Sequence, residues 1–375
     1  MKPAPRFDAW PLRPPPNYQH WMIGGLVVLA LVGSLGVLLR PVMERWLPLI
    51  GLLALALWLL ALLLRTLFFR FNRHNADCYT VAAQGVEHRW WSRHRQQAGL
   101  VEMVLLGPSC SAPQHRARLF MLERRPPPVV SSDAGKVLRI GQVLFEERSE
   151  RERQLARMLA LQLQVQRPEP FAEPFLACHW QGSLAAWKHF AAEMHQRFQL
   201  TLPEQPEPWL GQNSLDSLID RLHDAPEQAL VLCAGCESAA PDPHSPLPAG
   251  EAAVLWLLGK SGSVRVGRGE SFLAAADDLA TVAARALQQG GLAPTPLACA
   301  GFAAAADLDL SGLDWTPLQP PPETHFGELP RLQGMIALSL AAAHARLNAA
   351  SCAWLAADPS CTLALGVVTA DDSTR

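Results

Sequence analysis

The sequence has little charge and almost no tyrosine. Charged residues make up 18% of the 375 residues, and tyrosine occurs only twice. Lysine is scarce as well, whereas alanine, leucine, proline and arginine are common, a composition typical of bacteria with GC-rich genomes. The formal net charge is −2, with no long basic stripe and no acidic tail. These absences argue against nucleic acid as a partner, because binding it requires a positively charged surface.

A disulfide framework is also missing. Eight cysteines are scattered among apolar neighbours: Cys78, Cys110, Cys178, Cys233, Cys236, Cys299, Cys352 and Cys361. A cytoplasmic location would keep them reduced, and buried cysteines behave as small hydrophobic residues. We therefore expect most of them in the core, and the sequence predicts no catalytic, cofactor-binding or metal site.

Two long hydrophobic runs organise the chain. Residues 21–39 (WMIGGLVVLALVGSLGVLL) and 46–64 (WLPLIGLLALALWLLALLL) contain no charged residue. Each is long enough to cross about 30 Å of hydrocarbon as a helix, where every backbone amide must bond within its own segment. Buried core helices would instead carry polar residues on one face. We predict a transmembrane helical hairpin over residues 21–70, closed by the short connection 40–45.

Charge sets the expected orientation of this hairpin. Basic residues lie outside the two runs: Lys2, Arg6 and Arg13 before the first, and Arg65, Arg70, Arg73, Arg89, Arg93 and Arg95 after the second. In the connection, Glu44 offsets Arg40 and Arg45. The positive-inside rule then places both termini in the cytoplasm. The first run lacks a small-residue cleavage site, which argues against a signal peptide.

Three further segments complete the predicted organisation. Residues 1–20 are a proline-rich cytoplasmic arm, and residues 71–97 are a basic, aromatic juxtamembrane segment. This second segment is either the positive flank of a membrane helix or a contact with anionic headgroups through Trp90 and Trp91. Residues 98–375 form a cytoplasmic α/β domain, whose half at 98–209 fits the pattern less well.

Helical and strand patterns alternate through this domain, which predicts an α/β class. The expected helices cover residues 147–164, 182–198, 214–223, 274–290 and 332–347. The expected strands cover residues 100–106, 116–122, 136–144, 228–233, 250–258, 263–267, 297–301, 352–356 and 362–368. The strands at 250–258 and 263–267 are predicted to pair as a hairpin through the glycine-containing turn 259–262.

Two short motifs resemble functional sites. Cys233 and Cys236 have redox spacing, but a thioredoxin-type pair needs a helix after it, whereas residues 237–250 are proline-broken. A zinc site would need a second pair of ligands. Gly259-Lys260-Ser261 resembles the end of a P-loop, but Val254 occupies the position of its first glycine. A structural role is favoured for both motifs.

Other candidates are single side chains. Cys178 precedes a predicted helix and is a conceivable nucleophile, although the sequence places no base or oxyanion donor beside it. His189 and Glu193 lie four residues apart on a predicted helix, with His195 and His179 nearby. Metal ligands use that spacing, and so do ordinary exposed helix faces. The structural interpretation is again favoured.

Residues 211–375 resemble the thiolase-fold condensing enzymes, the β-ketoacyl synthases. The resemblance rests on segments that follow one another in the family's order: 212–215 (QNSL), 229–238 (ALVLCAGCES), 250–257 (GEAAVLWL), 326–341 (FGELPRLQGMIALSLA) and 355–368 (LAADPSCTLALGVV). It implies a layered α/β fold with paired central helices.

The departures from this family concern its chemistry. Gly211 stands where the family carries its catalytic cysteine, and residues 297–303 (LACAGFA) contain no histidine. Gly327-Glu328 stand where the second histidine belongs, with His325 displaced from it. Acyl transfer by this route needs a thiolate and groups that stabilise the developing negative charge. The resemblance therefore implies the fold without its catalysis.

The leading hypothesis is a non-catalytic scaffold or adaptor in the bacterial inner membrane. Ketosynthase-like proteins of this kind are associated with type VI secretion, so the expected partners are the lipid bilayer and proteins of a secretion apparatus. The resemblance also makes a homodimer through sheet edges plausible. Two alternatives remain open: a membrane-associated acyl-transfer enzyme that uses Cys178, and a redox or metal sensor that uses Cys233 and Cys236.

Overall fold

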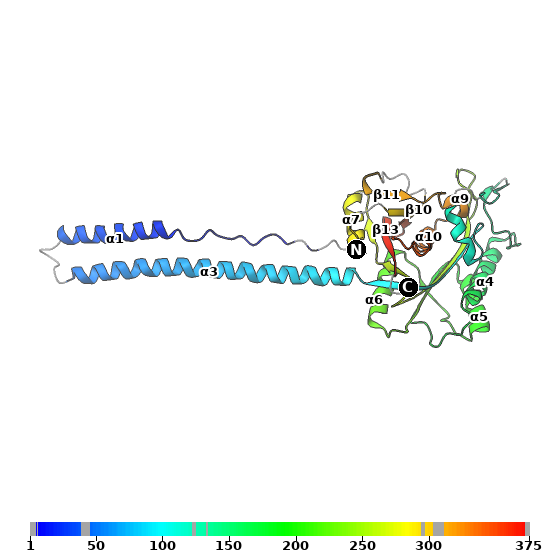
Figure 1. Cartoon of the computed structure of the whole chain (residues 1–375), viewed down its shortest axis with the longest axis horizontal. Coiled ribbons are helices and arrows are strands. Elements are labelled where there is room, and N and C mark those ends of the chain that lie inside the picture. Colours follow the sequence, from blue (N-terminus) through cyan, green and yellow to red (C-terminus); the bar gives the residue numbers. More distant parts are fainter. Residues whose placement is uncertain are drawn as a thin grey trace. The chain divides into compact units, whose positions relative to one another are not determined.

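The structure is a computed structural model of the chain. It describes residues 5, 7–38, 46–121, 125–132, 134–293, 297–302 and 311–371, so the predicted connection at 40–45 lies outside the described residues. Contacts divide the chain into two compact units, residues 2–92 and 93–375. Figure 1 shows the chain coloured along its sequence, with several of its helices and strands labelled.

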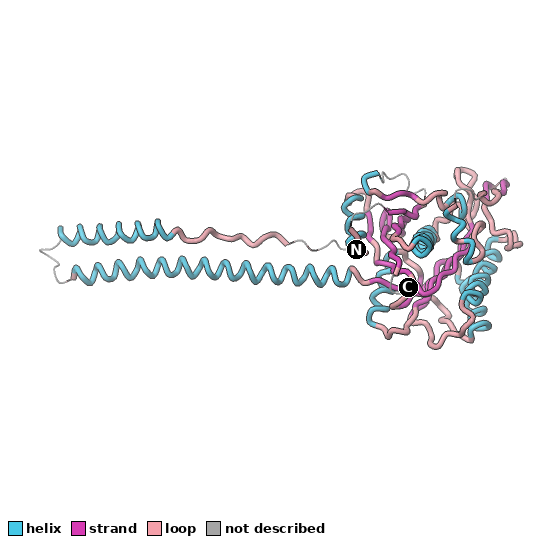
Figure 2. Tube along the Cα trace, viewed as in Figure 1, coloured by secondary structure: helices cyan, strands magenta, loops and turns pink. Residues whose placement is uncertain are grey.

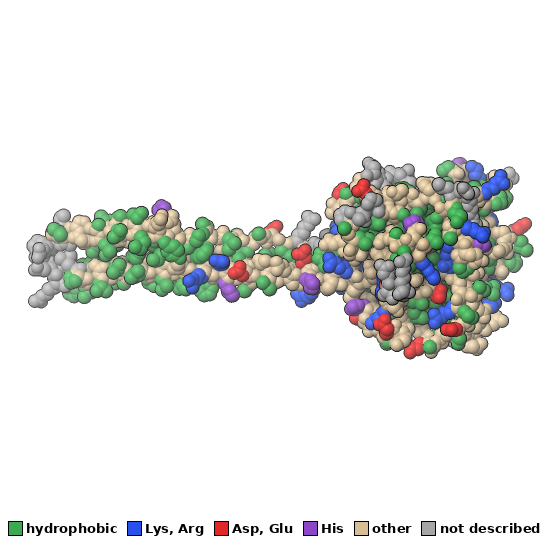
Figure 3. All heavy atoms as spheres, viewed as in Figure 1, with side chains coloured by type: hydrophobic (Ala, Val, Ile, Leu, Met, Phe, Trp, Pro, Cys, Tyr) green, Lys and Arg blue, Asp and Glu red, His purple; other side chains and the backbone are tan. Residues whose placement is uncertain are grey.

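Two helices dominate the first unit. They are α1 (Tyr18–Leu38) and α3 (Leu47–His94), whose last two residues belong to the second unit. Both are long and apolar enough to cross a membrane, and hydrophobic side chains cover much of their visible surface (Figure 3). Gly25 of α1 leaves the space that the Trp58 ring of α3 fills, because a Cβ there would lie 2.6 Å from the ring.

The second helix is much longer than the predicted span. It continues through residues 71–94, where the sequence indicated only a basic juxtamembrane segment. Its 48 residues correspond to about 72 Å at 1.5 Å per residue. A bilayer core of about 30 Å therefore accounts for less than half of α3.

The proline-rich arm follows one face of α3 in an extended conformation. The Trp10 indole donates a hydrogen bond to the Asn72 side chain (3.0 Å), and its ring lies 5.5 Å from that of Tyr79. Further along, Arg65 donates to the carbonyl of Pro14 (3.0 Å). These contacts connect residues far apart in sequence and cover one side of the helix.

The second unit alternates helices and strands, as the sequence predicts. Its helices are α4 (Arg148–Gln166), α5 (Leu184–Phe198), α6 (Gln212–Asp224), α7 (Leu279–Gln289), α9 (Glu323–Phe326) and α10 (Gln333–Asn348), with 3₁₀ turns at Pro113–His115, Ala117–Phe120 and Ser311–Leu313. Its strands are β1 (Gln97–Leu106), β2 (Val130–Ser132), β3 (Gly135–Val137), β4 (Ala177–Gln181), β5 (Glu207–Pro208), β6 (Val231–Ser238), β7 (Glu251–Gly259), β8 (Val264–Gly267), β9 (Glu270–Phe272), β10 (Leu297–Gly301), β11 (Trp315–Pro317), β12 (Cys352–Asp358) and β13 (Cys361–Ala370).

The same strand topology occurs twice. The strands of the main sheet follow the order β11-β10-β12-β13-β8-β1-β7-β6-β4-β5. The first half consists of β1, β4, β5, β6 and β7, and the second half consists of β8, β10, β11, β12 and β13. The strands of each half are numbered 1 to 5 in chain order. Both halves then have the order 3-2-4-5-1, with pairs 2-3 and 2-4 parallel and pairs 4-5 and 5-1 antiparallel. The two halves join where β1 pairs antiparallel with β8.

Helices lie between and outside these two half-sheets. The largest core cluster contains side chains of α6 and α10 together with one face of each half-sheet. A second cluster packs α4 and α5 on the opposite face of the first half, and a third packs α7 on the opposite face of the second half. Figure 2 shows α10 nearly end-on, with strands on either side of it. The predicted layers around two central helices are present.

One strand pairing differs from the prediction. Strands β7 and β8 do not form a hairpin, because β1 lies between them and pairs with both. Their connection at 259–262 therefore passes over β1, where a Cβ on Gly99 would collide with the Ser261 backbone. A local hairpin signal could not reveal a strand inserted from 150 residues earlier in the chain.

Two predicted strands are also wrong. Residues 113–120 form 3₁₀ turns instead of the strand predicted at 116–122, whose last residue is outside the described part. In the segment predicted at 136–144, β3 ends at Val137. Beyond it, side chains satisfy the backbone in place of a strand: Glu251 accepts from the Ile140 N–H (2.8 Å), and the Arg151 guanidinium donates to the Val143 carbonyl (2.7 Å).

Candidate functional site

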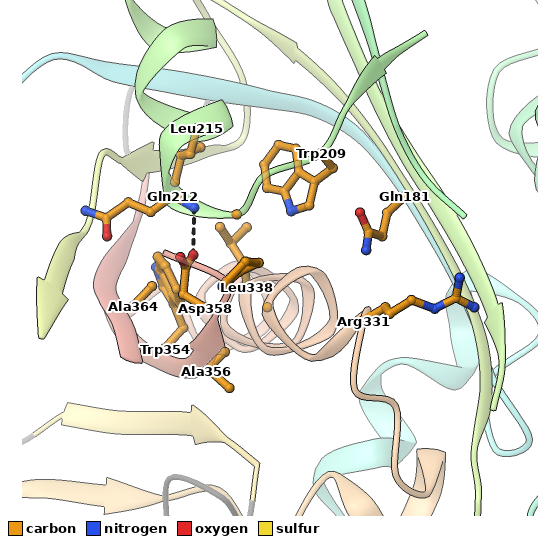
Figure 4. Close-up of a pocket in the computed structure, with 14 residues that line it drawn as sticks. Gln181, Trp209, Gln212, Leu215, Arg331, Leu338, Trp354, Ala356, Asp358 and Ala364 are labelled. Carbon is orange, nitrogen blue, oxygen red and sulfur yellow. Dashed lines mark hydrogen bonds between the residues drawn. The ribbon is translucent and has the colours of Figure 1, made fainter. Parts of the chain in front are cut away.

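A cavity opens at the N-terminus of α6, between the two central helices. Figure 4 shows Trp209, Leu338 and Trp354 around it, with Asp358 beside the start of α6. The residues that line it are Gln181, Trp209, Gly211, Gln212, Leu215, Arg331, Gly334, Leu338, Trp354, Ala356, Ala357, Asp358, Pro359 and Ala364. Its volume of about 40 Å³ leaves room for only a few water molecules at about 10–15 Å³ each. Among these described lining residues there is no cysteine, histidine, serine or threonine.

Gly211 occupies the junction between the β5 connector and α6. Its backbone has φ 62° and ψ −131°, in the left-handed half of conformational space that glycine adopts without strain. Its carbonyl accepts from the Ser214 N–H (3.1 Å) and the Leu215 N–H (3.2 Å), which starts the helix. The resemblance places a catalytic cysteine at this position, where the chain has no side chain at all.

Asp358 fills the space beside that glycine. Its Oδ2 accepts from the Gln212 N–H (2.9 Å), and its Oδ1 accepts from the Ser360 N–H (2.9 Å) and hydroxyl (2.6 Å). A Cβ on Gly211 would collide with this carboxylate. The first turn of a helix carries unpaired N–H groups and a partial positive charge, so a carboxylate is stabilised there. The chain's own carboxylate thus occupies the helix end that would otherwise attract an anion.

The second central helix is capped in the same way. Glu237 Oε2 accepts from the N–H groups of Arg331 and Leu332 (both 3.0 Å) at the start of α10, and Oε1 accepts from the Arg331 side chain (3.1 Å). Glu237 lies near the end of β6, and Asp358 ends β12, the equivalent strand of the other half. Each half therefore supplies the carboxylate that caps the other half's central helix.

The middle of α6 is anchored by buried Arg268. Its guanidinium donates to the carbonyls of Arg93 (2.9 Å) and Asp216 (3.2 Å) and to the side chains of Gln96 (2.6 Å) and Asp220 (2.6 Å). Sequence reasoning missed this cluster, because its members come from three distant segments. It fixes the position of α6, and hence of Gly211, against the start of β1.

Asp216 makes stability dependent on pH. Burial raises the pKa of its carboxyl from 3.8 to about 6, and Arg268 opposes the shift. An acid with a raised pKa in the folded state costs stability once ionised, so stability falls as the pH rises from about 4 through about 6. We expect Asp216→Asn to stabilise the chain at pH 7.5 by up to about 3 kcal/mol, at 1.36 kcal/mol per pKa unit.

Urea unfolding of the two chains at pH 7.5 and at pH 3.5 tests this expectation. The gain should nearly vanish at pH 3.5, where Asp216 is protonated in the folded chain and mostly protonated in the unfolded chain. An equal gain at both pH values would contradict it, because a gain without pH dependence cannot come from ionisation.

The cysteines considered as nucleophiles lie within the core. Burial raises the pKa of Cys178 to about 12 and the pKa of Cys233 well above its ordinary value. Cys178 faces the outer layer under α4 and α5, so the adjacent His179 points to the opposite face of β4. Register instead places His179 beside Cys233 of β6 and beside Glu207 of β5. The sequence contained no sign that His179 lies beside Cys233, because the two residues are 54 positions apart in the chain.

The Cys233 and Cys236 pair lies inside β6, not after a strand as the motif analysis assumed. Three residues apart in a strand, the two side chains point to opposite faces. Cys233 accordingly belongs to the central cluster and Cys236 to the outer one. The sheet separates their thiols, so they do not form a redox pair in this fold.

The P-loop-like motif and the possible metal ligands on α5 also have structural roles. Gly259-Lys260-Ser261 ends β7 and leads over β1, with no helix following it. On α5, Glu193 pairs with Arg157 (3.0 Å) and Arg197 (2.9 Å), while His189 and His195 are exposed. No group of three or more histidine, cysteine or acidic side chains in the described residues is arranged to hold a metal ion.

The family's histidine positions are equally altered. Strand β10 contains no histidine, and Ala303, the last residue of the segment inspected in the sequence, is outside the described residues. His325 lies on α9, where its Nδ1 is 3.1 Å from the Ser109 hydroxyl. It is not among the residues that line the cavity. The arrangement does not place the three catalytic side chains of the condensing enzymes around the α6 N-terminus.

Comparison with solved structures identifies the fold as thiolase-like. The ishigamide ketosynthase/chain length factor matches with a TM-score of 0.50 and 17% identity, over 73% of this chain and 99% of that chain. Acetamide-bound Xanthomonas campestri OleA matches with a TM-score of 0.42, 11% identity and coverage of 73% and 99%. HMG-CoA synthase complexed with CoA matches with a TM-score of 0.41 and 10% identity, over 73% of this chain and 82% of that chain.

The first of these matches shows the fold alone, because 17% identity says nothing reliable about function. No protein-family model and no curated protein sequence matches the chain. Within the described residues, the segment 98–209 contributes most of β1 and the whole of β4 and β5 to the main sheet.

Proposed function

We propose that this chain is a non-catalytic scaffold or adaptor, anchored in the bacterial inner membrane by α1 and α3. The observation that carries the proposal is the pair of Gly211 and Asp358 at the start of α6. The position of the family's nucleophile has no side chain, and a carboxylate from the other half neutralises the helix end beside it. The matching cap of Glu237 on α10 supports a structural purpose for both carboxylates.

The membrane part of the proposal rests on length, composition and charge. Both helices are long and apolar enough for a membrane span, and the basic residues outside the two runs favour a cytoplasmic location for both termini. The partners proposed for the cytoplasmic domain are proteins of a secretion apparatus, with type VI secretion as the context that the fold resemblance suggests. Lipid is the other partner, and nucleic acid is not.

A homodimer is part of the proposal, but the sheet edge is poorly suited to form it. The two edge strands of the main sheet are short: β5 has two residues, Glu207–Pro208, and β11 has three, Trp315–Pro317. Proline has no N–H to donate, and short, proline-containing edge strands resist pairing with another chain. Another surface is therefore needed to bring two copies together.

Acyl loading tests the non-catalytic proposal. The full chain with Cys78→Ser, which removes the exposed thiol, is incubated with acyl-thioesters and analysed by peptide mass spectrometry. We expect no covalent adduct at any buried cysteine. A stoichiometric, stable acyl adduct on Cys178 or Cys233 would reject the proposal.

The second candidate function is acyl transfer at the membrane face, and one observation favours it. His179 lies in register with Cys233 and Glu207 on one face of the sheet, in the order of a nucleophile, a base and an orienting carboxylate. Trp209, whose ring is 6.2 Å from that of His179, separates this group from the cavity. Under this alternative, Cys233→Ser abolishes acyl loading and Cys178→Ser does not.

A further inference from the structure

Helix α3 has two different faces. Along one face it is covered by its own chain: Trp58 lies against Gly25 of α1, and Asn72 and Tyr79 contact Trp10 of the arm. Ala76, between the last two, is only 6% exposed. The residues of one helix face recur every three or four positions along the chain. A residue two positions after a covered residue is rotated by about 200° around the helix axis, so it lies on the opposite face.

Apolar side chains recur at heptad spacing on that other side. Leu60, Leu64, Leu67, Phe71, Cys78 and Val81 follow one another in steps of four, three, four, seven and three residues. Exposure is 64% for Phe71 and 69% for Val81, and Cys78 is also exposed. His74 occupies the remaining position between Phe71 and Cys78. Leu60, Leu64 and Leu67 are between 41% and 57% exposed, and the His74 Nε2 lies 3.6 Å from the Cys78 sulfur.

We propose that α3 binds α3 of a second copy of this chain through this stripe, as a parallel coiled coil. Alternating steps of three and four are the pattern by which helices pair along a seam. The inference rests on the membrane anchoring proposed above. Two copies held in one membrane with the same orientation present their helices parallel and at the same height, so each stripe residue meets its counterpart.

The cytoplasmic part of the stripe supplies the specificity. Within lipid, apolar side chains gain little from leaving lipid for one another. Phe71, Cys78 and Val81 lie beyond the predicted span that ends at residue 64, and Val81 is roughly 25 Å further along the helix at 1.5 Å per residue. Burial of these side chains is favourable in water, and the polar His74 fixes the register, as single polar core residues do.

Cys78 gives a direct test in the full chain. With Cys361→Ser as background, Cys78 is the one exposed thiol among the eight cysteines. Membranes containing this chain are treated with copper phenanthroline, whose copper(II) takes the two electrons released when two thiols form a disulfide. Counterpart Cα atoms must approach to about 4.4–6.8 Å for that bond. We expect a covalent dimer of twice the chain mass.

Two variants in a Cys78→Ser, Cys361→Ser background give the matched control. Val81→Cys puts the thiol in the stripe, and Thr80→Cys puts it two residues from Cys78, on the opposite side. We expect the first to cross-link at least fivefold more than the second. Equal cross-linking, no cross-linking, or an adduct with a different protein would overturn the parallel dimer.

Carbonate extraction of the same membranes separates this outcome from failure of the anchoring itself. A chain that stays in the pellet but does not cross-link refutes the coiled coil alone. A chain released into the supernatant refutes the anchoring on which the inference rests.

Discussion

Replacing Glu251 with glutamine should destabilise the cytoplasmic domain by about 3–5 kcal/mol, because it leaves a buried guanidinium without its counter-ion. The Arg151 guanidinium donates to both Glu251 oxygens (2.7 Å each), and the two side chains are 9% and 0% exposed. Glu251 also accepts from the Ile140 N–H (2.8 Å). The pair thus connects α4, the start of β7 and the irregular segment after β3.

Urea unfolding of the full chain in detergent, followed by tryptophan fluorescence, measures this loss. Glu207→Gln is the matched control, because its partner Arg221 lies at the surface, where side-chain exposures are 41% and 45%. Exposed pairs contribute about 0–1 kcal/mol. Similar losses in both variants would show that burial does not govern the effect.

Alanine at Gly211 should cost roughly 2–6 kcal/mol. The positive φ of this residue costs a non-glycine side chain about 1–3 kcal/mol, and crowding against Asp358 adds about 1–3 kcal/mol. Gly334→Ala is the matched control in the same cavity. It lies in α10, its nearest neighbour would be Ala356 at 3.9 Å, and glycine-to-alanine changes of this kind stabilise by about 0.4–1 kcal/mol.

The double variant Gly211→Ala, Asp358→Ala separates the two contributions. Removing the carboxylate relieves the collision but also removes the cap, which costs about 1 kcal/mol. We expect the double variant to be more stable than the sum of the single losses by at least about 1 kcal/mol, as is usual for residues in contact. Strict additivity would mean that Asp358 does not occupy the space beside residue 211.

Local patterns predicted the helices well and the strand partners poorly. The α7 helix ends at Gly290, as the sequence predicted, but it begins after Asp278, whose side chain accepts from the Thr281 N–H, and not at residue 274 where the predicted helix began. The partner of β7 was not readable, because β1 joins it from a distant part of the chain. Asp358 was missed for a related reason: Asp-Pro-Ser predicts a turn but not the helix that the turn caps.

The candidate site shows the same division. The sequence indicated a glycine, Gly211, at the position where the resemblance expects a nucleophile. Residues 212–215 alone were enough to assign that position. The sequence assigned no base to Cys178, which agrees with the alternation along β4, but it could not show that the sheet register brings His179 beside Cys233. Likewise, the spacing of Cys233 and Cys236 implied proximity that a strand does not allow.

By itself, the amino-acid sequence determined the two apolar helices, the alternation of helices and strands, and the absence of a side chain at residue 211. These features depend on the hydrophobic runs and the spacing of apolar residues within one segment of the chain. Tertiary structure alone decided the repeated strand order, the exchange of helix-capping carboxylates between the halves, and the two-sided character of α3. Each of these needs contacts between segments far apart in the chain, and no local preference specifies such contacts.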